Sequence, residues 1–381
     1  MASRAPPSQM GGVLFGIITL TQRRIWENMK KGYLILANGM VFEGERFGAE
    51  TDVIGELVFT TGMVGYLETL TDPSYAGQII MQTFPLIGNY GVIEQDFEGA
   101  CAALGYVVHE NCDYPSNFRS QYALDKFLKD RGIPGLSGIE TRDVTRILRD
   151  AGTMNAMIAS AVPEDLSRLK AYRVVNSVAS VSTREAGFLP ADGEEKFRVA
   201  LIDYGAKRNI ARELAKRGCA VTIFPYDAKA EDVLKMNPDG IMLTNGPGDP
   251  ADNAEIIAEL EKMAGKKPIF GICLGHQLLA LAMGAKTGKL PFGHRGANQP
   301  VKDLETGRTY ITSQNHGYAV LPETLAGVGV LRYVNANDRT CEGVDYPDKR
   351  AFTVQFHPEA CGGPEDTEFL FDRFISLMEG K

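Results

Sequence analysis

The sequence predicts an α/β protein in which a doubly wound parallel sheet, over residues 197–381, follows a mixed α/β domain over residues 30–181. Three observations lead to this prediction. Apolar strand patterns alternate with helical patterns from residue 198 onward, which is typical of a parallel sheet covered on both faces. A β-rich stretch with a hairpin signal comes before it. The length of 381 residues also suits two domains of ordinary size.

Composition and charge narrow the classes of function. Hydrophobic residues make up 44% of the chain and charged residues 23%, which is the composition of a globular protein with a buried core. The formal net charge of −8 and the lack of a long basic run argue against a nucleic-acid partner. The six cysteines show neither CxxC pairs nor zinc-ligand spacing, so we expect no metal and no disulfide scaffold. The longest uncharged apolar stretch near the start, residues 11–20, is too short to span a bilayer, and we expect a cytoplasmic protein without a membrane partner.

Residues 1–29 differ from the rest of the chain. They begin with a Pro-Pro-Ser stretch, show no helical or strand period, and end at a second methionine, Met29. We interpret them as a disordered extension or as the result of a start codon placed too early. A targeting segment is the alternative, and it has little support in the residues.

The first domain is predicted from short strand patterns. Residues 33–37 and 40–47 flank Asn38-Gly39 and predict a hairpin with a type I′ turn, because both turn residues tolerate the positive φ that this turn needs. Further elements of this domain are expected as strands at residues 56–60, 78–84 and 104–109 and as helices at residues 121–131 and 141–150.

Residues 182–196 separate the two domains. They contain glycines, a proline and several acidic residues with little periodicity, and we expect a linker. The second domain is then expected to have strands at residues 198–203, 220–224, 240–244, 268–272 and 351–356, and helices at residues 207–217, 253–264 and from 274 onward. In such a sheet ligands bind beyond the carboxyl ends of the strands, so the loops that follow the strands are where a site is expected.

Cys273 is the first candidate for chemistry. It lies where an apolar strand meets an apolar helix, between Gly271 and Gly275, which is the cysteine form of the G-x-S-x-G nucleophile elbow. The turn leaves no room for side chains two residues before and after the nucleophile, so glycine is needed there. The helix N-terminus is expected to favour the thiolate. The alternative is an inert buried cysteine, the commonest fate of a free cysteine.

His357 is the candidate base for that nucleophile. It follows the strand at residues 351–356, so its ring is expected at the same edge of the sheet as Cys273. Glu359, two residues later, can accept a hydrogen bond from the ring and fix its tautomer, and Pro358 stiffens the turn. The alternative is a structural histidine.

The loop at residues 244–250 is a candidate oxyanion site. Gly246 and Gly248 let the backbone approach a ligand, and their N–H groups can stabilise an oxyanion, although Pro247 has none to donate. An ordinary turn is the alternative. The chain shows neither a phosphate loop nor a dinucleotide fingerprint, so nucleotide binding by this chain is not expected.

Several motifs together resemble a known family. GICLGHQ, NGPGDP and FHPE, in their order and spacing, resemble class I glutamine amidotransferases over residues 197–381. GELVFTTGMVGYLETLTDPSY at residues 55–75 and DYGAKRNI at residues 203–210 are similar, within that class, to the small subunits of carbamoyl-phosphate synthases.

The resemblance implies roles for individual residues. It implies Cys273 as nucleophile, His357 as acid and base, and Glu359 as the residue that orients His357. The residues expected to bind L-glutamine and its oxyanion are Ser74, Gly246, Gly248, Leu274, Gln277, Asn315, Gly317 and Tyr318. Of these, Ser74 would reach over from the first domain, and the segment at residues 314–320 would contact the α-amino and α-carboxylate groups. Two departures from the family pattern stand out: Tyr318 replaces a common Phe, and Cys361 is an extra thiol close to Glu359.

The resemblance also implies a reaction and a partner. Glutamine would be hydrolysed to glutamate and ammonia through a cysteinyl thioester, and ammonia would pass to a large synthase subunit. That subunit would use bicarbonate and ATP to make carbamoyl phosphate for arginine and pyrimidine synthesis in a heterodimer or larger assembly. No cofactor is expected in this chain, and ATP and a divalent metal are expected on the large subunit. The alternatives are the amidotransferase subunit of another synthase, a γ-glutamyl cysteine hydrolase or peptidase, and a non-catalytic subunit with a vestigial cysteine.

Overall fold

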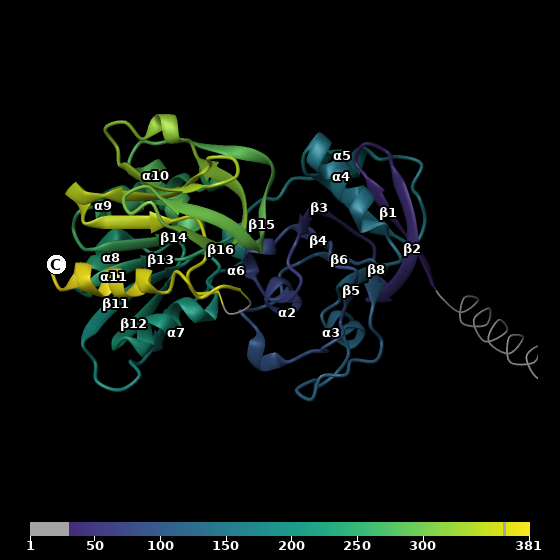
Figure 1. Ribbon diagram of the computed structural model, residues 1–381, viewed down its shortest axis with the longest axis horizontal. Helices are drawn as coiled ribbons and strands as arrows, with labels where there is room; N and C mark the ends of the chain where they lie inside the picture. The colour runs from purple at the N-terminus through teal and green to yellow at the C-terminus, as the bar shows by residue number, and fades with distance from the viewer. Residues whose placement is uncertain (1–29, 361–362) are drawn as a thin grey trace, which may run out of the picture.

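The computed structural model describes residues 30–360 and 363–381 and shows two domains side by side (Figure 1). The expectations for residues 1–29 and for Cys361 fall outside these residues. The same described residues include no helix with both the length and the apolar character needed to cross a bilayer.

The first domain is a closed β-barrel. Its strands are β1 (Lys31–Leu36), β2 (Val41–Gly48), β3 (Val53–Thr60), β4 (Gln78–Gln82), β6 (Gly105–Val107), β8 (Pro134–Ser137) and β9 (Met154–Ala159). They follow the order β1-β2-β8-β6-β4-β3-β9, and antiparallel pairing of β1 with β9 closes the barrel. The other elements are β5 (Leu86–Ile87), β7 (Glu110–Asn111), α2 (Tyr66–Leu70), α3 (Leu124–Asp130), α4 (Thr141–Ala151), α5 (Ser167–Ala171) and α6 (Ser177–Val181). The mixed α/β character is as predicted, whereas the sequence analysis did not predict that the strands close into a barrel.

The predicted first hairpin forms, but its turn is not type I′. The connection between β1 and β2 is longer than two residues, and Gly39 donates to the carbonyl of Leu36 at 2.8 Å. Gly39 has φ +91°, whereas Asn38 is not among the residues with positive φ, and a type I′ turn needs both. The Asn38 side chain instead accepts a hydrogen bond from the Met40 amide at 3.0 Å, which supports the longer turn.

The second domain is built on a ten-stranded sheet. Its strands are β10 (Gly187–Leu189), β11 (Phe197–Asp203), β12 (Cys219–Pro225), β13 (Gly240–Leu243), β14 (Ile269–Ile272), β15 (Thr287–Asp303), β16 (Thr309–Val320), β17 (Val330–Asn335), β18 (Cys341–Tyr346) and β19 (Ala351–Val354). The order is β10-β12-β11-β13-β14-β19-β18-β17-β15-β16. The strands from β12 to β19 in this order are parallel, as predicted, and β10 and β15 to β18 are antiparallel additions.

Helices cover both faces of the parallel strands. The helices are α7 (Arg208–Lys216), α8 (Ala230–Lys235), α9 (Ala254–Met263), α10 (Leu274–Ala282) and α11 (Phe369–Met378). Successive residues of β11 alternate between the two apolar cores: Val199 packs with the residues of α7 and α11, and Ala200 with those of α8, α9 and α10. This alternation is the doubly wound arrangement that the sequence predicts.

The segment at residues 182–196, expected to be a linker, contains the short edge strand β10. β10 pairs antiparallel with β12, and the Thr183 amide donates to the Asp203 carboxylate at 2.7 Å. Its three residues are too few to show a strand period, which is why the sequence pattern did not reveal it.

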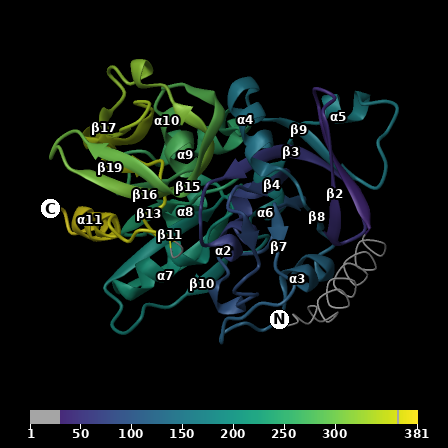
Figure 2. The same ribbon diagram turned by 45° about the vertical axis from the view of Figure 1, so that its right-hand side comes forward.

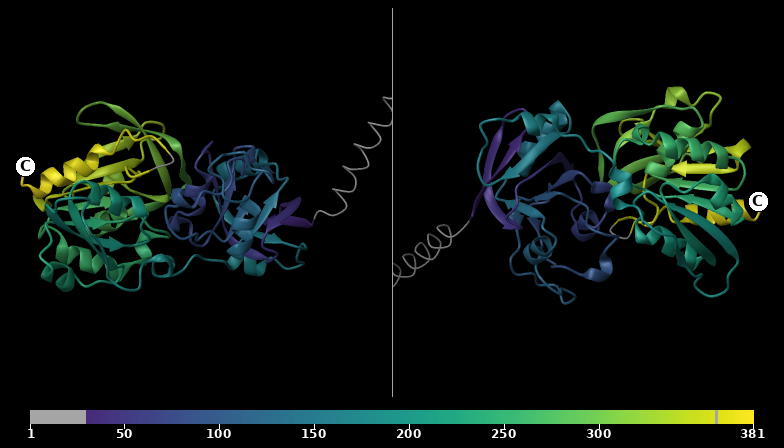
Figure 3. Two further views of the ribbon diagram at one scale, coloured as in Figure 1. Left: turned by 90° about the horizontal axis from the view of Figure 1, so that it is seen from below. Right: turned by 180° about the vertical axis from the view of Figure 1, so that it is seen from behind.

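The barrel lies against the edge of the sheet where β15 and β16 run (Figures 2 and 3). Hydrogen bonds cross this junction from the Thr61 amide to the Arg295 carbonyl at 3.2 Å and from the Thr153 amide to the Pro291 carbonyl at 2.7 Å. Asn245, just beyond the carboxyl end of β13, also donates from Nδ2 to the Ser74 hydroxyl of the barrel at 2.9 Å, so a site at this end of the parallel strands can take residues from both domains.

Candidate active site

Cys273 occupies a strained turn between β14 and α10. Its φ of +53° and ψ of −103° are rare for a residue with a side chain and are typical of a nucleophile elbow. A Cβ on Gly275 would lie 2.5 Å from the Leu243 carbonyl oxygen, and one on Gly271 would lie 2.9 Å from the Thr353 methyl carbon. The prediction that the elbow needs glycine on both sides is confirmed.

His357 lies just beyond the neighbouring parallel strand. Ile272 of β14 pairs with Val354 of β19, and the Cys273 amide donates to the Val354 carbonyl at 2.8 Å, so both candidates leave the same edge of the sheet. The Nδ1 of His357 is 2.7 Å from Oε1 of Glu359. Its Nε2 is buried and has no hydrogen-bond partner among the described residues. If Nδ1–H donates to the carboxylate, Nε2 keeps its lone pair and can take a proton.

The environment of the Cys273 thiol disfavours the thiolate. Burial is the main cause and the Asp72 carboxylate adds to it, and together they raise the pKa of the thiol to about 12. The Lys207 ammonium and, less strongly, the hydrogen bond from the Leu274 amide act in the opposite direction but are outweighed. The Leu274 amide at the start of α10 thus lowers the pKa, as expected of a helix N-terminus, but the thiolate is not the favoured form because burial dominates. The thiol is protonated at neutral pH and needs a base to take its proton.

Cys273, His357 and Glu359 form the candidate triad, and a buried network of ion pairs includes Glu359. The ammonium of Lys207 lies 3.6 Å from Oδ2 of Asp72 and 3.8 Å from Oε1 of Glu359. Burial alone would raise the pKa of each carboxyl, but neighbouring groups lower the pKa of both: Lys207 acts most strongly on Asp72, and His357, which is hydrogen-bonded to Glu359, acts most strongly on Glu359. The sequence analysis missed Asp72 and Lys207. The signal was weak, because an Asp before Pro-Ser and a Lys at a helix start usually face solvent.

A cavity of about 540 Å³ lies between the two domains and contains Cys273. The other sequence-predicted residues that line it are Ser74, Gly246, Gly248, Gln277, Asn315, Gly317 and Tyr318. Leu274, His357 and Glu359 are buried beside this cavity and do not line it. The structure thus brings the predicted residues from both domains to one place, and their individual roles remain predictions.

Two side chains of the barrel form hydrogen bonds with asparagines of the second domain. The hydroxyl of Ser74 accepts a hydrogen bond from Nδ2 of Asn245 at 2.9 Å, and Asp72 accepts one from Nδ2 of Asn315 at 3.0 Å. The Asn315 carbonyl oxygen lies 3.7 Å from the sulfur of Cys273. The side-chain amide of Asn315 is thus bound to Asp72, and its expected contact with the α-groups of glutamine stays a prediction.

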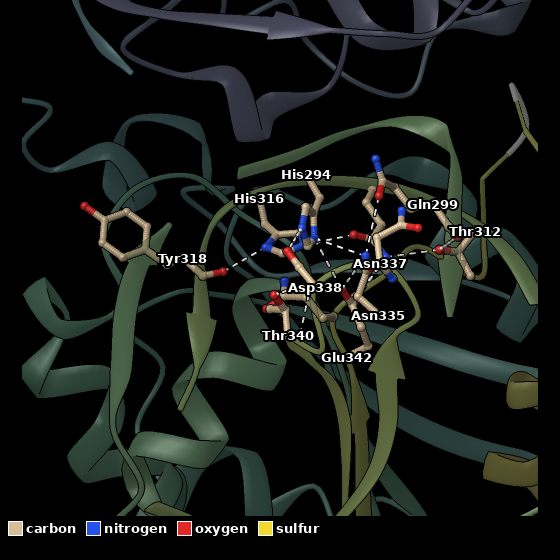
Figure 4. Close-up of polar contacts among 12 residues, drawn as sticks. His294, Gln299, Thr312, His316, Tyr318, Asn335, Asn337, Asp338, Thr340 and Glu342 are labelled. Carbon is tan, nitrogen blue, oxygen red and sulfur yellow. Dashed lines mark hydrogen bonds and ion pairs between the residues drawn. The ribbon is translucent and has the colours of Figure 1, made fainter. Parts of the chain in front are cut away.

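Buried polar side chains form hydrogen bonds with β16, the strand that contains Tyr318 (Figure 4). Nε2 of Gln277 donates to the Tyr318 carbonyl at 2.7 Å, and Nδ1 of His316 lies 2.8 Å from the same oxygen. Further along the network, Nε2 of His294 is 2.8 Å from Oδ2 of Asp338, and its Nδ1 is 3.3 Å from Oε1 of Glu342.

Three residues of this network have the composition of a metal site. His294, His316 and Glu342 offer ligand atoms within 4.8 Å of one another. Burial lowers the pKa of His294, but Asp338 and Glu342 outweigh it and raise the value to about 9. An imidazolium has no lone pair for a metal. We therefore interpret the cluster as a hydrogen-bond network, and the expectation of no metal in this chain remains a prediction.

Comparisons with known proteins match each of the two domains to a family. Residues 200–377 match the family described as Glutamine amidotransferase class-I, and residues 34–158 match the family described as Carbamoyl-phosphate synthase small chain, CPSase domain. The carbamoyl phosphate synthase small chain of Listeria monocytogenes serotype 4b (strain F2365) is 51% identical over 93% of this chain and 98% of its own. The small chain from Clostridium perfringens (strain 13 / Type A) is 51% identical over 91% and 99%, and that from Bacillus caldolyticus is 51% identical over 91% and 96%.

Proposed function

The chain belongs to the carbamoyl phosphate synthase small-chain family, and from this membership we propose that it is the subunit that hydrolyses glutamine for that synthase. The observation that carries the proposal is the strained elbow of Cys273 beside a buried His357–Glu359 pair, on neighbouring strands of the same sheet. Membership of the small-chain family, which includes a match to its first domain, argues against the amidotransferase of another synthase.

The first half-reaction forms a thioester. Glutamine enters the cavity between the domains with its side-chain amide beside Cys273. Nε2 of His357 takes the thiol proton as the sulfur attacks the amide carbon, because the thiol does not ionise by itself at neutral pH. Backbone N–H groups of Gly248 and Leu274 stabilise the oxyanion, and each such donor contributes about 10²–10³-fold to the rate.

The second half-reaction releases both products. The imidazolium of His357 gives its proton to the leaving nitrogen, so that the C–N bond breaks and ammonia departs. His357 then takes a proton from water, whose oxygen attacks the thioester carbon, and glutamate leaves as the sulfur recovers its proton. Glu359, 2.7 Å from Nδ1, stabilises the positive charge on the ring in both halves.

We further propose that ammonia passes to a large synthase subunit, where ATP, a divalent metal and bicarbonate yield carbamoyl phosphate for arginine and pyrimidine synthesis. An enclosed route is needed because ammonia in water becomes ammonium and is no longer nucleophilic. A second cavity of about 60 Å³ supports this proposal: it shares Asn315 with the first cavity and includes Asp72, Lys207 and Glu98. It would form the start of the route.

Replacement of Cys273 tests the proposed function. In the complex with its large subunit, Cys273→Ala should abolish glutamine-dependent carbamoyl phosphate synthesis and leave ammonia-dependent synthesis intact. Cys219→Ala is the matched control, because Cys219 is also buried but lies outside the cavity. Glutamine-dependent synthesis that survives in Cys273→Ala would rule out this cysteine as the nucleophile. Release of glutamate from γ-glutamyl peptides at rates equal to those with free glutamine would favour the γ-glutamyl hydrolase alternative.

A further inference from the structure

Glu98 is a buried carboxyl group that the hydrolysis steps above do not use. It lies just after the 3₁₀ helix η2 (Glu94–Asp96), and only 3% of it is exposed. Within the described part of the chain, its Oε2 is buried without a hydrogen-bond partner, and Glu98 forms no ion pair. Buried polar atoms in proteins are normally paired, so an unpaired one that lines a cavity points to a ligand.

The cavity that Glu98 lines is the second one, of about 60 Å³. Asn315 lines both this cavity and the one that contains Cys273, and the Asn315 carbonyl oxygen is 3.7 Å from the sulfur. The second cavity suits molecules as small as water or ammonia, whereas the first, of about 540 Å³, is large enough for glutamine. A ligand of Glu98 is therefore a small molecule that comes from beside the reacting centre.

Hydrogen bonds from both domains fix the backbone of Glu98. Its amide donates to the hydroxyl of Thr71 in the barrel at 2.9 Å, and its carbonyl accepts from the Arg208 amide at the start of α7 at 2.8 Å. Thr71 precedes Asp72 and Arg208 follows Lys207 in the sequence, so Glu98 is held beside both members of an ion pair that crosses the junction. The carboxyl group thus has a defined place in the cavity.

The other charged groups of the second cavity do not need Glu98 as a partner. Lys207 lies 3.6 Å from Asp72 and 3.8 Å from Glu359, so two carboxylates already balance its charge. Glu68, the third carboxylate that lines the cavity, is only partly buried. Burial raises the pKa of Glu98 to about 7, although Lys207 opposes this, so both forms of the carboxyl group are present near neutral pH. Each form has an oxygen that can accept a hydrogen bond.

Ammonia fits the groups of this cavity and is a product of the proposed reaction. Its N–H groups can donate to Oε2 of Glu98, and its lone pair can accept from the ammonium of Lys207. That ammonium has N–H groups to give, because its carboxylate partners at 3.6 Å and 3.8 Å are beyond hydrogen-bond distance. A metal cation fits less well, because it has no lone pair for Lys207 and would be repelled by its charge.

A contact in the second cavity matters because ammonia can be lost from the first. Lys289 lines the first cavity, and about half of its side chain is exposed, so this cavity reaches solvent. We propose that Glu98 binds ammonia in the second cavity as a hydrogen-bond acceptor and so prevents its return to the first cavity. This inference rests on the proposed glutaminase function and on the proposed route, and it assigns a role to a residue that the sequence analysis did not name.

The test measures carbamoyl phosphate and glutamate together in the complete complex supplied with L-glutamine. Glu98→Leu has no acceptor and should lower the carbamoyl phosphate formed per glutamate by about three- to tenfold, the effect of one net hydrogen bond. Glu98→Gln keeps a carbonyl oxygen and should stay within about twofold of the wild type. Since an unpaired buried carboxyl does not stabilise a fold, Glu98→Leu should also resist urea at least as well as the wild type.

Glu94→Leu is the matched control, because Glu94 is exposed in the same segment and lines neither cavity, and its ratio should equal that of the wild type. Synthesis from added ammonium chloride reports that each complex is folded and assembled. A wild-type ratio in Glu98→Leu, or equal losses in Glu98→Leu and Glu98→Gln, would overturn the inference and leave the glutaminase function standing. If Glu98→Leu does not fold, Glu98→Met replaces it, and failure of both would show a structural role and overturn the inference. A wild type that does not hydrolyse glutamine would overturn the proposed function as well.

Discussion

Lys207 shows how single residues set the charge balance of the site. It is buried between Asp72 of the barrel and Glu359 of the candidate triad, and both carboxylates raise the pKa of its ammonium although burial opposes this. The same positive charge contributes to keeping both carboxylates ionised. Without it, Glu359 would be a less reliable acceptor for His357.

We expect Lys207→Met to lower the free energy of unfolding by about 3–5 kcal/mol, since it leaves two buried carboxylates without their cation. Urea denaturation of this chain without its large subunit measures this loss of unfolding free energy. Lys229→Met is the control: Lys229 is exposed and 3.9 Å from Glu259, so its loss should change the free energy by no more than about 0.5 kcal/mol. Equal stability of Lys207→Met and the wild type would contradict the role given to Lys207.

Sequence patterns identified the residues whose type and neighbours are themselves unusual. Few structural roles require a cysteine between two such glycines, as at Cys273, or a histidine two residues before a glutamate at a strand end, as at His357. Lys207 and Asp72 were missed because a charged residue in a single sequence is most often solvated. Only the fold shows that one bridges the two domains and that the other lies in a cavity.

Among the helices and strands, those with longer and more regular apolar patterns were predicted best from the sequence. The parallel strands β11, β13 and β14 are continuous apolar runs, and their bounds agree with the prediction within one residue. β15 was not predicted because its 17 residues include glycines and prolines, which usually mark turns, and its pairing with β16 shifts register twice. In the barrel, β6 lies within the strand predicted at residues 104–109, whereas β8 has four residues, too few for a period of two to be visible.

The network behind β16 should make stability depend on pH. The folded pKa of His294, about 9, is raised above the ordinary value of 6.5. The contribution of the His294 charge to the free energy of unfolding is therefore complete below pH 6.5 and is lost as the pH rises through 9. The loss should amount to at most about 3 kcal/mol. The measurement is urea unfolding of the wild type and His294→Asn between about pH 6 and pH 9.5, a range that brackets both pKa values. The difference between them should shrink over this range, and a difference that stays constant with pH would show that His294 is not a buried imidazolium.

At the scale of the whole molecule, the candidate site belongs to both domains. The second domain supplies Cys273, His357 and Glu359, and the barrel supplies Ser74 and Asp72, which are hydrogen-bonded to Asn245 and Asn315 across the junction. The two family matches correspond to the two domains, since one ends at residue 158 and the other begins at residue 200. The barrel is therefore part of the candidate site.

We propose that glutamine is hydrolysed through a covalent bond to Cys273. The most direct measurement is mass spectrometry of the complex, stopped by acid during turnover with glutamine and digested into peptides. A γ-glutamyl group should be found on the peptide that contains Cys273, and it should disappear when glutamine is exhausted. Rapid consumption of glutamine with no such adduct under conditions in which thioesters survive, or with the adduct on another cysteine, would contradict hydrolysis through Cys273.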